Sequence, residues 1–203
     1  MKTFVYIDGF NLYYGALRNT PYKWLDLHTL CRKLLPHDNI CLIRYFTAYV
    51  KPRFNDPDQL NRQLVYLRAL KTIPLIEIHL GSFLSNTVSR PMADGSGYVN
   101  VIEVNEKGSD VNLATYLMHD GHKGLYDTAV LITNDSDLVE PVRIVRYELE
   151  KMTGVIIPHP HASRKLLETA NFIKRIRTGV LRDSQFPNEM RDSEGLFHKP
   201  LVW

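Results

Sequence analysis

The sequence predicts an α/β fold, a three-layer sandwich in which a mostly parallel central sheet lies between two layers of helices. Runs rich in β-branched and aromatic residues alternate along the chain with segments of helical periodicity. Such alternation indicates crossover connections, which place helices on both faces of a parallel sheet. With 203 residues, 44% of them apolar, the chain can bury one core and is short for two full domains.

Strands are expected where β-branched and aromatic residues run together and stop at a turn residue. The first such run, residues 3–7, stops at Asp8, and the second is interrupted only by Arg44. The expected strands are residues 3–7, 40–50, 75–80, 128–133, 155–157 and 172–176.

Helices are expected where apolar residues recur every three or four positions behind a capping residue or a proline. Pro36 closes one such segment and Asp56-Pro57 opens the next. In that next segment the repeating apolar residues are Leu60, Leu64, Leu67 and Leu70. The expected helices are residues 11–17, 27–35, 56 onward, 110–120, 138–152 and 163–170.

Two segments depart from the alternation. In residues 82–105, Ser, Asn, Pro, Asp and Gly separate two strand-like pieces, which predicts a β-hairpin insertion. This hairpin could gate a site or form a homodimer contact, and the residues do not choose between the two. The apolar rhythm fails from about residue 180. We therefore expect a domain over residues 1–178 and a C-terminal tail, 179–203, lying on or near its surface.

The charge pattern permits a nucleic-acid partner without requiring one. The net charge is +3 and the pI is about 8.8. Residues 161–182 concentrate cations against a single acidic residue, Glu168. These cations are Arg164, Lys165, Lys174, Arg175, Arg177 and Arg182. The alternative interpretation is that these cations form an ordinary solvent-exposed face. They support a nucleic-acid-binding role only if they lie beside the candidate site.

Several classes of protein are disfavoured. Cys31 and Cys41 do not form a C-x-x-C pair and no second pair exists, so a structural zinc finger is excluded and both are expected as reduced thiols. The amino terminus lacks a signal-peptide cleavage pattern. No window approaches the roughly 20 apolar residues that span a bilayer. We expect a cytoplasmic protein without a membrane partner.

Four aspartates fall where strands end or helices begin: Asp8, Asp110, Asp135 and Asp137. Because the loops after parallel strands converge on one edge of a sheet, we expect these carboxylates to meet there. Like charges at close range cannot all stay ionised, and a hard divalent cation removes that conflict. The pattern therefore predicts that the four bind metal and support phosphodiester hydrolysis, while Asn11 orients a carboxylate or a phosphate oxygen.

Each aspartate also has a purely structural interpretation. Asp137 with Glu140 fits a capping box, Ser109 suits the N-cap of the helix that holds Asp110, and Asp8-Gly9 would serve as a turn. Caps and turns are commoner than metal sites, so no single aspartate establishes the site. The four together, each at the correct end of its element, favour a cation site.

Other motifs are weaker. The segment after the first strand lacks the G-x-G-x-x-G of a dinucleotide site, and Phe10 stands where an aspartyl phosphatase needs a second aspartate. His159-Pro160-His161 has no third ligand nearby, so we expect a surface loop. The Tyr13-Tyr14 pair either packs in the core or stacks on bases.

At these residues the chain resembles a known family. The motifs Y-I-D-G-F-N-L at 6–12, E-K-G-S-D-V at 106–111 and L-I-T-N-D-S-D-L at 131–138 resemble those of the NYN family, also called the LabA-like or DUF88 group. The resemblance covers residues 3–176 and implies a PIN-like nuclease fold. Residues 15–27 and the tail segments S-Q-F-P and K-P-L-V-W resemble a bacterial subgroup, in which the tail belongs to the domain.

The resemblance implies a carboxylate site for Mg²⁺ or Mn²⁺ and metal-dependent cleavage of RNA. The family's first-strand aspartate and its neighbouring asparagine fall on Asp8 and Asn11. The aspartate after the E-K-G turn falls on Asp110, and the D-x-D pair falls on Asp135 and Asp137. Relatives often carry alanine-aspartate in the last helix, where this chain has Ala170-Asn171, so no further carboxylate is expected there.

We therefore expect a Mg²⁺- or Mn²⁺-dependent ribonuclease with nucleic acid, RNA in particular, as its partner. The residues expected to hold the nucleic-acid backbone are Lys107, Arg164, Lys165, Lys174 and Arg175. One alternative is an NADH-dependent hydroxylase of a succinylated hydroxypyridine, because a member of the same subgroup is known as one. The other is a non-catalytic domain that binds nucleic acid or a protein.

Overall fold

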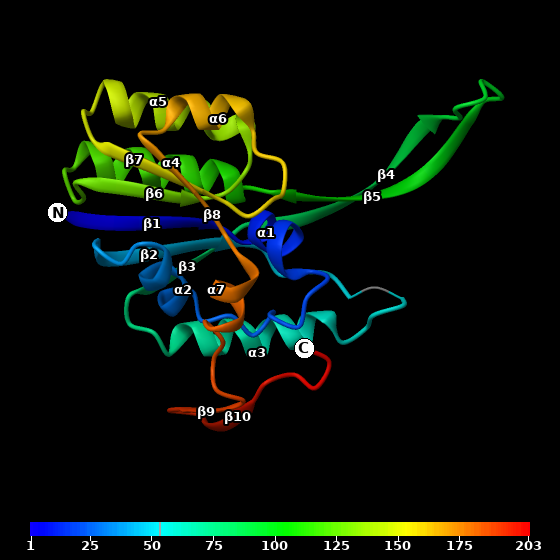
Figure 1. Cartoon of the computed structure of the whole chain (residues 1–203). Helices are drawn as coiled ribbons and strands as arrows, with labels where there is room; N and C mark the ends of the chain where they lie inside the picture. The colour runs from blue at the N-terminus through cyan, green and yellow to red at the C-terminus, as the bar shows by residue number, and fades with distance from the viewer. Residues whose placement is uncertain (53) are drawn as a thin grey trace.

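The computed structural model describes residues 1–52 and 54–203. Its main sheet has six parallel strands in the order β3-β2-β1-β6-β7-β8 (Figure 1). These strands are β1 (Lys2–Asp8), β2 (Asn39–Thr47), β3 (Ile76–Leu80), β6 (Thr128–Ile132), β7 (Met152–Ile157) and β8 (Phe172–Arg175). The parallel central sheet predicted from the alternating pattern is confirmed.

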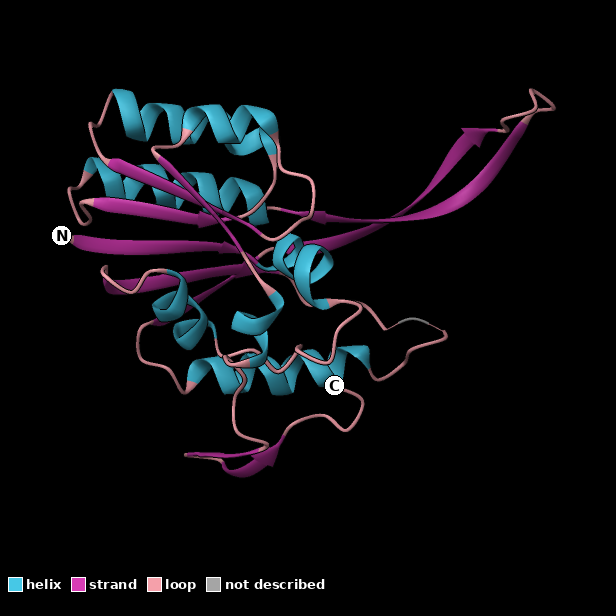
Figure 2. Ribbon diagram, in the orientation of Figure 1, coloured by secondary structure: helices cyan, strands magenta, loops and turns pink. Residues whose placement is uncertain are grey.

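Helices cover both faces of this sheet, which confirms the three-layer arrangement (Figure 2). One layer holds α4 (Ser109–His122), α5 (Val139–Tyr147) and α6 (Arg164–Thr169). The other holds α2 (Leu27–Leu34), α3 (Gln59–Lys71) and α7 (Thr178–Arg182). Alternate residues of β1 serve the two layers, since Val5 and Ile7 join one core cluster while Phe4 and Tyr6 join the other.

A long hairpin projects from the globular body (Figure 1). It consists of β4 (Ser82–Pro91) and β5 (Tyr98–Lys107), paired antiparallel along their whole length. The hairpin predicted over 82–105 is confirmed. Tyr98 and Ile102 lie on one face of the arm and are 76% and 73% exposed. Whether the arm gates a site or contacts a second copy stays a prediction.

Two helix predictions need correction. Within the predicted apolar repeat of α3, Leu67 and Leu70 are buried, whereas Leu64 is 43% exposed; Tyr66, outside that repeat, is buried as well. The helix expected over 138–152 begins with a 3₁₀ turn, η2 (Ser136–Leu138), and α5 ends at Tyr147. The chain then turns through Glu150, whose φ of 54° is left-handed, and enters β7.

The C-terminal segment, expected to lie on or near the surface of the domain, packs against the α2–α3 layer. After α7 it forms the small hairpin of β9 (Glu189–Asp192) and β10 (Gly195–His198). Phe186 and Phe197 are buried in the same cluster as the α2–α3 layer. The rings of Trp203 and Trp24 lie 6.4 Å apart. Isolated large aromatic residues, rather than a periodic stripe, anchor this segment. The domain boundary at 178 stays a prediction.

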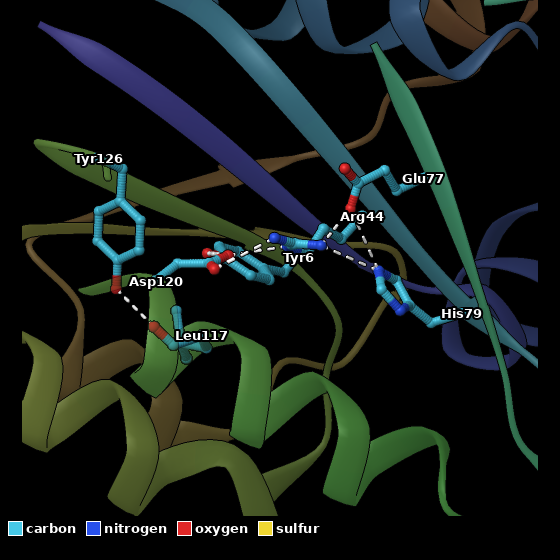
Figure 3. A network of polar contacts seen from close by, with 7 residues as sticks. All are labelled: Tyr6, Arg44, Glu77, His79, Leu117, Asp120 and Tyr126. Carbon is cyan, nitrogen blue, oxygen red and sulfur yellow. Dashed lines mark hydrogen bonds and ion pairs between the residues drawn. The ribbon is translucent and has the colours of Figure 1, made fainter. Parts of the chain in front are cut away.

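A buried polar network ties three strands to α4 (Figure 3). Asp120, 1% exposed, accepts hydrogen bonds from Arg44 Nε (2.8 Å) and from the Tyr6 hydroxyl (2.8 Å). Arg44 also pairs with Glu77 and contacts the ring nitrogen of His79. Burial and the guanidinium lower the pKa of His79, so a neutral ring can accept from Arg44. Arg44, the charged residue of β2, is therefore a structural part of the core.

Within the described residues, no helix is both long and apolar enough to cross a lipid bilayer.

Candidate functional site

The candidate site lies where the order of the sheet reverses. β1 and β6 are neighbours in the sheet although they lie far apart in sequence, and the connections from each run to opposite sides. Ligands bind in α/β sheets at the carboxyl ends of the strands around such a reversal. Asp8 is the last residue of β1, and Thr133 to Asp135 directly follow β6. The topology thus brings two of the predicted motifs side by side.

Asp8 is fixed and almost fully buried. It is 3% exposed, and its carboxylate accepts from the backbone N–H of Asn11 (2.9 Å) and from the hydroxyl of Thr133 (3.2 Å). It also caps α1 (Gly9–Leu12). Burial raises the pKa of Asp8 above its usual range, and the charge of Asp135 adds to this rise. Asp8 is both a cap and a candidate ligand.

A second set of hydrogen bonds shapes the loop after β6. The Thr133 hydroxyl accepts from the N–H of Asp135 (3.1 Å), and Asp135 accepts from the N–H of Asp137 (2.9 Å). Asn11 joins the two loops, because its side-chain oxygen accepts from the N–H of Asn134 (3.1 Å). Asn11 therefore holds the site together, and whether it also touches a substrate stays a prediction.

Two of the structural interpretations of the aspartates are wrong. Asp135, not Asp137, accepts the capping hydrogen bond of η2, and Glu140 pairs with Arg143 instead of closing a capping box. The residue before α4 is Gly108, with a left-handed φ of 100°, so Ser109 lies inside the helix. Asp137 and Ser109 are thus free of the capping roles that the sequence suggested.

The first turn of α4 brings Asp110 to the other carboxylates. Burial and then the charges of Asp8, Asp135, Glu106 and Asp137 raise the pKa of Asp110 to about 6. Each of those charges must be near Asp110 to act on it. Glu106, at the end of β5, accepts from the N–H (3.1 Å) and hydroxyl (2.8 Å) of Ser109, which fixes it beside the helix.

The acidic cluster has the donor chemistry of a divalent-cation site. Its members are Asp8, Glu106, Asp110, Asp135 and Asp137. No ion pair found among the described residues involves any of them. In the part of the chain that the structure describes, no three acidic, His or Cys side chains converge tightly enough to hold a metal. Repulsion between the like charges favours a wide spacing of the carboxylates. Carboxylate and amide oxygens are the ligands that Mg²⁺ and Mn²⁺ prefer. The residues suit such an ion in their donor chemistry but not in the spacing that their side chains have in this structure.

Four members of the cluster, Asp8, Glu106, Asp110 and Asp135, line a cavity of about 660 Å³. Asp137 does not line it, whereas Asp8, Asn11, Asp110 and Asp135 do. Aromatic residues make much of the wall: Phe10, Tyr13, Tyr14, Tyr45, Tyr66, Phe83 and Trp203. Cations line it as well: Arg18, Lys23, Lys51 and Arg62. The cavity therefore joins carboxylates, aromatic rings and basic groups in one space.

Sequence reasoning missed the basic lining of this cavity and also Glu106. Arg18 and Lys23 lie in the 15–27 segment, to which no site role was assigned, and Lys51 belongs to no motif; all three reach the cavity through the fold. Glu106 begins the E-K-G-S-D segment already singled out, so its acidic side chain was a usable signal. Tyr13 packs against the core, as one interpretation of the tyrosine pair expected, while Tyr14 is 49% exposed and its stacking on bases stays a prediction.

None of the five predicted backbone-binding cations lines the acidic cavity. Arg164 pairs with Glu168 on α6, next to Lys165, and Lys107 ends the hairpin. Lys174 donates its ammonium to the carbonyl of Leu34 (2.5 Å), and Arg175 donates to that of Pro160 (2.7 Å). Asn171 accepts from Thr153 within the β7–β8 region and lies apart from the carboxylates.

Comparison with known proteins agrees with this architecture. The parallel six-stranded sheet with an acidic edge is consistent with the PIN-like class of α/β domains. A crystal structure of a protein of unknown function from Vibrio parahaemolyticus shares the fold, with a TM-score of 0.54 and 17% identity. The match covers 87% of this chain and 93% of that one.

The sequence places the chain more narrowly. The NYN domain profile matches residues 2–177, and the chain belongs to the NYN domain family. It is also 32% identical to the 6-hydroxy-3-succinoylpyridine 3-monooxygenase HspA of Pseudomonas putida over 236 aligned positions, which cover all of this chain and 75% of that protein. Membership of the NYN family suggests a nuclease-type, hydrolytic function, and nucleases of this type typically use divalent metals.

Proposed function

We propose that this protein is a Mg²⁺- or Mn²⁺-dependent ribonuclease that hydrolyses phosphodiester bonds at the carboxyl edge of its sheet. The observation that carries the proposal is the cluster of five acidic residues, none of which joins an ion pair found in residues 1–52 and 54–203, and of which Asp110 has a pKa raised to about 6. A bound cation would lower the free energy of this repulsion. RNA is the proposed substrate because the family is nuclease-like and the cavity has basic and aromatic walls.

The residues of the chain have distinct proposed roles. Asp8, Asp110, Asp135 and Asp137 would hold the ion, and Asn11 positions Asp8 and the loop after β6. A bound Mg²⁺ or Mn²⁺ supplies Lewis-acid stabilisation of phosphate charge and lowers the pKa of a coordinated water. The basic wall attracts the phosphates of the strand.

Stacking adds a second, sequence-tolerant source of affinity. Phe10 and Phe83, whose rings pack edge to face 5.6 Å apart, and the exposed Tyr14 line the same cavity. Base–aromatic stacking is worth about 1–3 kcal/mol per base. A single-stranded segment, whose bases are free to stack, is therefore the proposed form of the substrate.

The test incubates purified protein with single-stranded and structured RNA, with Mg²⁺, with Mn²⁺ or with EDTA. We expect cleavage only with a metal, and a loss of at least about a hundredfold in Asp8→Asn and in Asp135→Asn. Asp38→Asn, near the opposite edge of the sheet, is the matched control and should keep its activity. Cleavage that survives EDTA or both site substitutions contradicts the metal mechanism. Retardation of RNA without cleavage in any metal supports a non-catalytic binding domain instead.

A second candidate function is oxygenation of a hydroxypyridine that carries a succinoyl group. The 32% identity to the Pseudomonas putida monooxygenase over the whole chain favours it. Aromatic walls with Arg18, Lys23 and Lys51 would also suit an aromatic ring bearing a carboxylate. This reaction consumes O₂ and a two-electron reductant such as NADH. The absorbance of NADH, followed with and without the pyridine, separates the candidates, because the nuclease predicts no substrate-dependent oxidation.

A further inference from the structure

A second cavity, of about 870 Å³, lies on the other side of the helical segment that follows β1. The π-helical turn η1 (Tyr13–Leu17) separates the two spaces. Tyr13, Tyr14 and Leu17 line the acidic cavity, whereas Gly15 and Ala16 line the second one. Its remaining walls come from the end of α2, the loop after β7, β8 and the start of α7.

The second cavity is basic. Its charged lining residues are Lys33, Lys174, Arg175 and Arg177, joined by His159, and no acidic residue lines it in the described part of the chain. None of the four cations belongs to an ion pair found among the described residues. The carboxylate of Asp183 feels the charge of Lys33, but its main partner is Arg182. Four like charges around one space favour an anion there.

Part of this basic lining is held in place by backbone groups. Lys174 donates to the carbonyl of Leu34 in the last turn of α2, and Arg175 donates to the carbonyl of Pro160. Both cations keep further N–H donors, because an ammonium has three and a guanidinium five. His159 lies against Gly15, where a Cβ would approach its ring to 2.6 Å. The cavity is therefore built from fixed groups, while Lys33 and Arg177 extend freely at its exposed rim.

We propose that this cavity binds phosphate groups of the same nucleic-acid strand that enters the acidic cavity; the proposal rests on the proposed nuclease function. An α-helix is about 10 Å across, so a strand that crosses η1 can reach both spaces. Single-strand-binding folds hold about 4–16 nucleotides, which is enough to occupy both. The acidic cavity then receives the reacting phosphodiester, and the basic cavity holds neighbouring phosphates.

The test measures binding of a labelled single-stranded RNA of about 12 nucleotides in EDTA, by fluorescence anisotropy over a range of KCl concentrations. Each phosphate contact on a single strand contributes about −0.7 to the slope of log K against log salt. Lys33→Gln/Arg177→Gln should therefore reduce the slope by about 1.4 and weaken binding about 25-fold at about 0.1 M salt, relative to a 1 M reference. Both side chains are exposed at the rim, so folding should be unaffected.

The matched control is Lys123→Gln/Lys151→Gln, which removes the same charge near the opposite edge of the sheet. Equal slopes for the two double variants overturn the proposal. A phosphate source other than the strand is tested by titrating inorganic phosphate and adenosine monophosphate. If Lys33→Gln/Arg177→Gln weakens only these small anions and leaves RNA binding unchanged, the assignment to the strand is wrong.

Cleavage is assayed separately in Mg²⁺ and Mn²⁺. If the salt-dependence slope of Lys33→Gln/Arg177→Gln is reduced but no RNA is cleaved, the phosphate cavity is supported and the nuclease function is contradicted. If RNA is cleaved but the two double variants have equal slopes, the nuclease function is supported and the phosphate cavity is contradicted.

Discussion

Removing one carboxylate from the acidic cluster should stabilise the protein in the absence of divalent cations. Asp110 is the residue of choice, because its pKa rises to about 6 through burial and four neighbouring carboxylates. Without solvent screening, a rise of the Asp110 pKa from 3.8 to about 6 would correspond to ~3 kcal/mol in the free energy of unfolding. Asp110 is more than a third exposed, so solvent screening reduces the effect. We expect Asp110→Asn to increase the free energy of unfolding by about 1 kcal/mol at pH 7.5.

The sign of the pH dependence follows from linkage. The folded state holds the Asp110 proton up to a higher pH than the unfolded state, so ionisation penalises folding as the pH rises. The penalty is absent below about pH 4, grows between about pH 4 and 6, and is complete above that range. The advantage of Asp110→Asn should therefore vanish at low pH.

Urea denaturation followed by circular dichroism measures this effect, with EDTA and then with Mg²⁺ in the buffer. In EDTA, thermal unfolding should show the same gain of about 1 kcal/mol as a rise of ~2–4 °C in Tm. Mg²⁺ should remove the difference, because wild type gains a bound ion that the variant holds less well. Glu150→Gln, which removes a surface charge elsewhere, should show neither effect. A variant that is less stable than wild type in EDTA at pH 7.5 would refute the reasoning about repulsion.

Three further substitutions test other parts of the structure by urea denaturation. Asp120→Asn should cost about 3–5 kcal/mol, because it removes the buried one of the two carboxylates that pair with Arg44, and a loss below 1 kcal/mol contradicts that view. Trp203→Ala should cost about 2 kcal/mol through lost aromatic packing, and an unchanged midpoint would show that the C-terminus is dispensable. Gly154→Ala should cost about 1–3 kcal/mol, because its Cβ meets the ring of Phe172; full stability would mean that the ring moves aside freely.

Much of the fold was predictable because its signals are local. The residue types of a short segment predict its conformation in two places: the β-rich run at residues 3–7 and the turn residues of the 82–105 hairpin. The end of α5 was missed because the chain leaves the helix after Tyr147 and reverses at Glu150, whose left-handed φ has no local signal in a glutamate. The burial of Phe197 likewise depends on a contact surface supplied by distant elements.

Part of the candidate site could likewise be predicted from the sequence, and part could not. Asp8 and Asp135 could be placed together from the sequence, since the ends of parallel strands meet at one edge. Arg18, Lys23 and Lys51 could not, because their approach to the cavity depends on how the chain between β1 and α3 packs. The sequence indicated a run of cations at 161–182. It did not indicate that some of these cations line the second, basic cavity and not the acidic one.

The position of the tryptophans gives the molecule a built-in optical probe. The chain has two, Trp24 and Trp203, with ring centroids 6.4 Å apart. Trp203 lines the acidic cavity, and Trp24 is fully buried behind it. All intrinsic tryptophan emission therefore originates within one cluster at the edge of the site. Entry of a nucleic acid, or detachment of the C-terminal segment, should change its intensity and wavelength without any label.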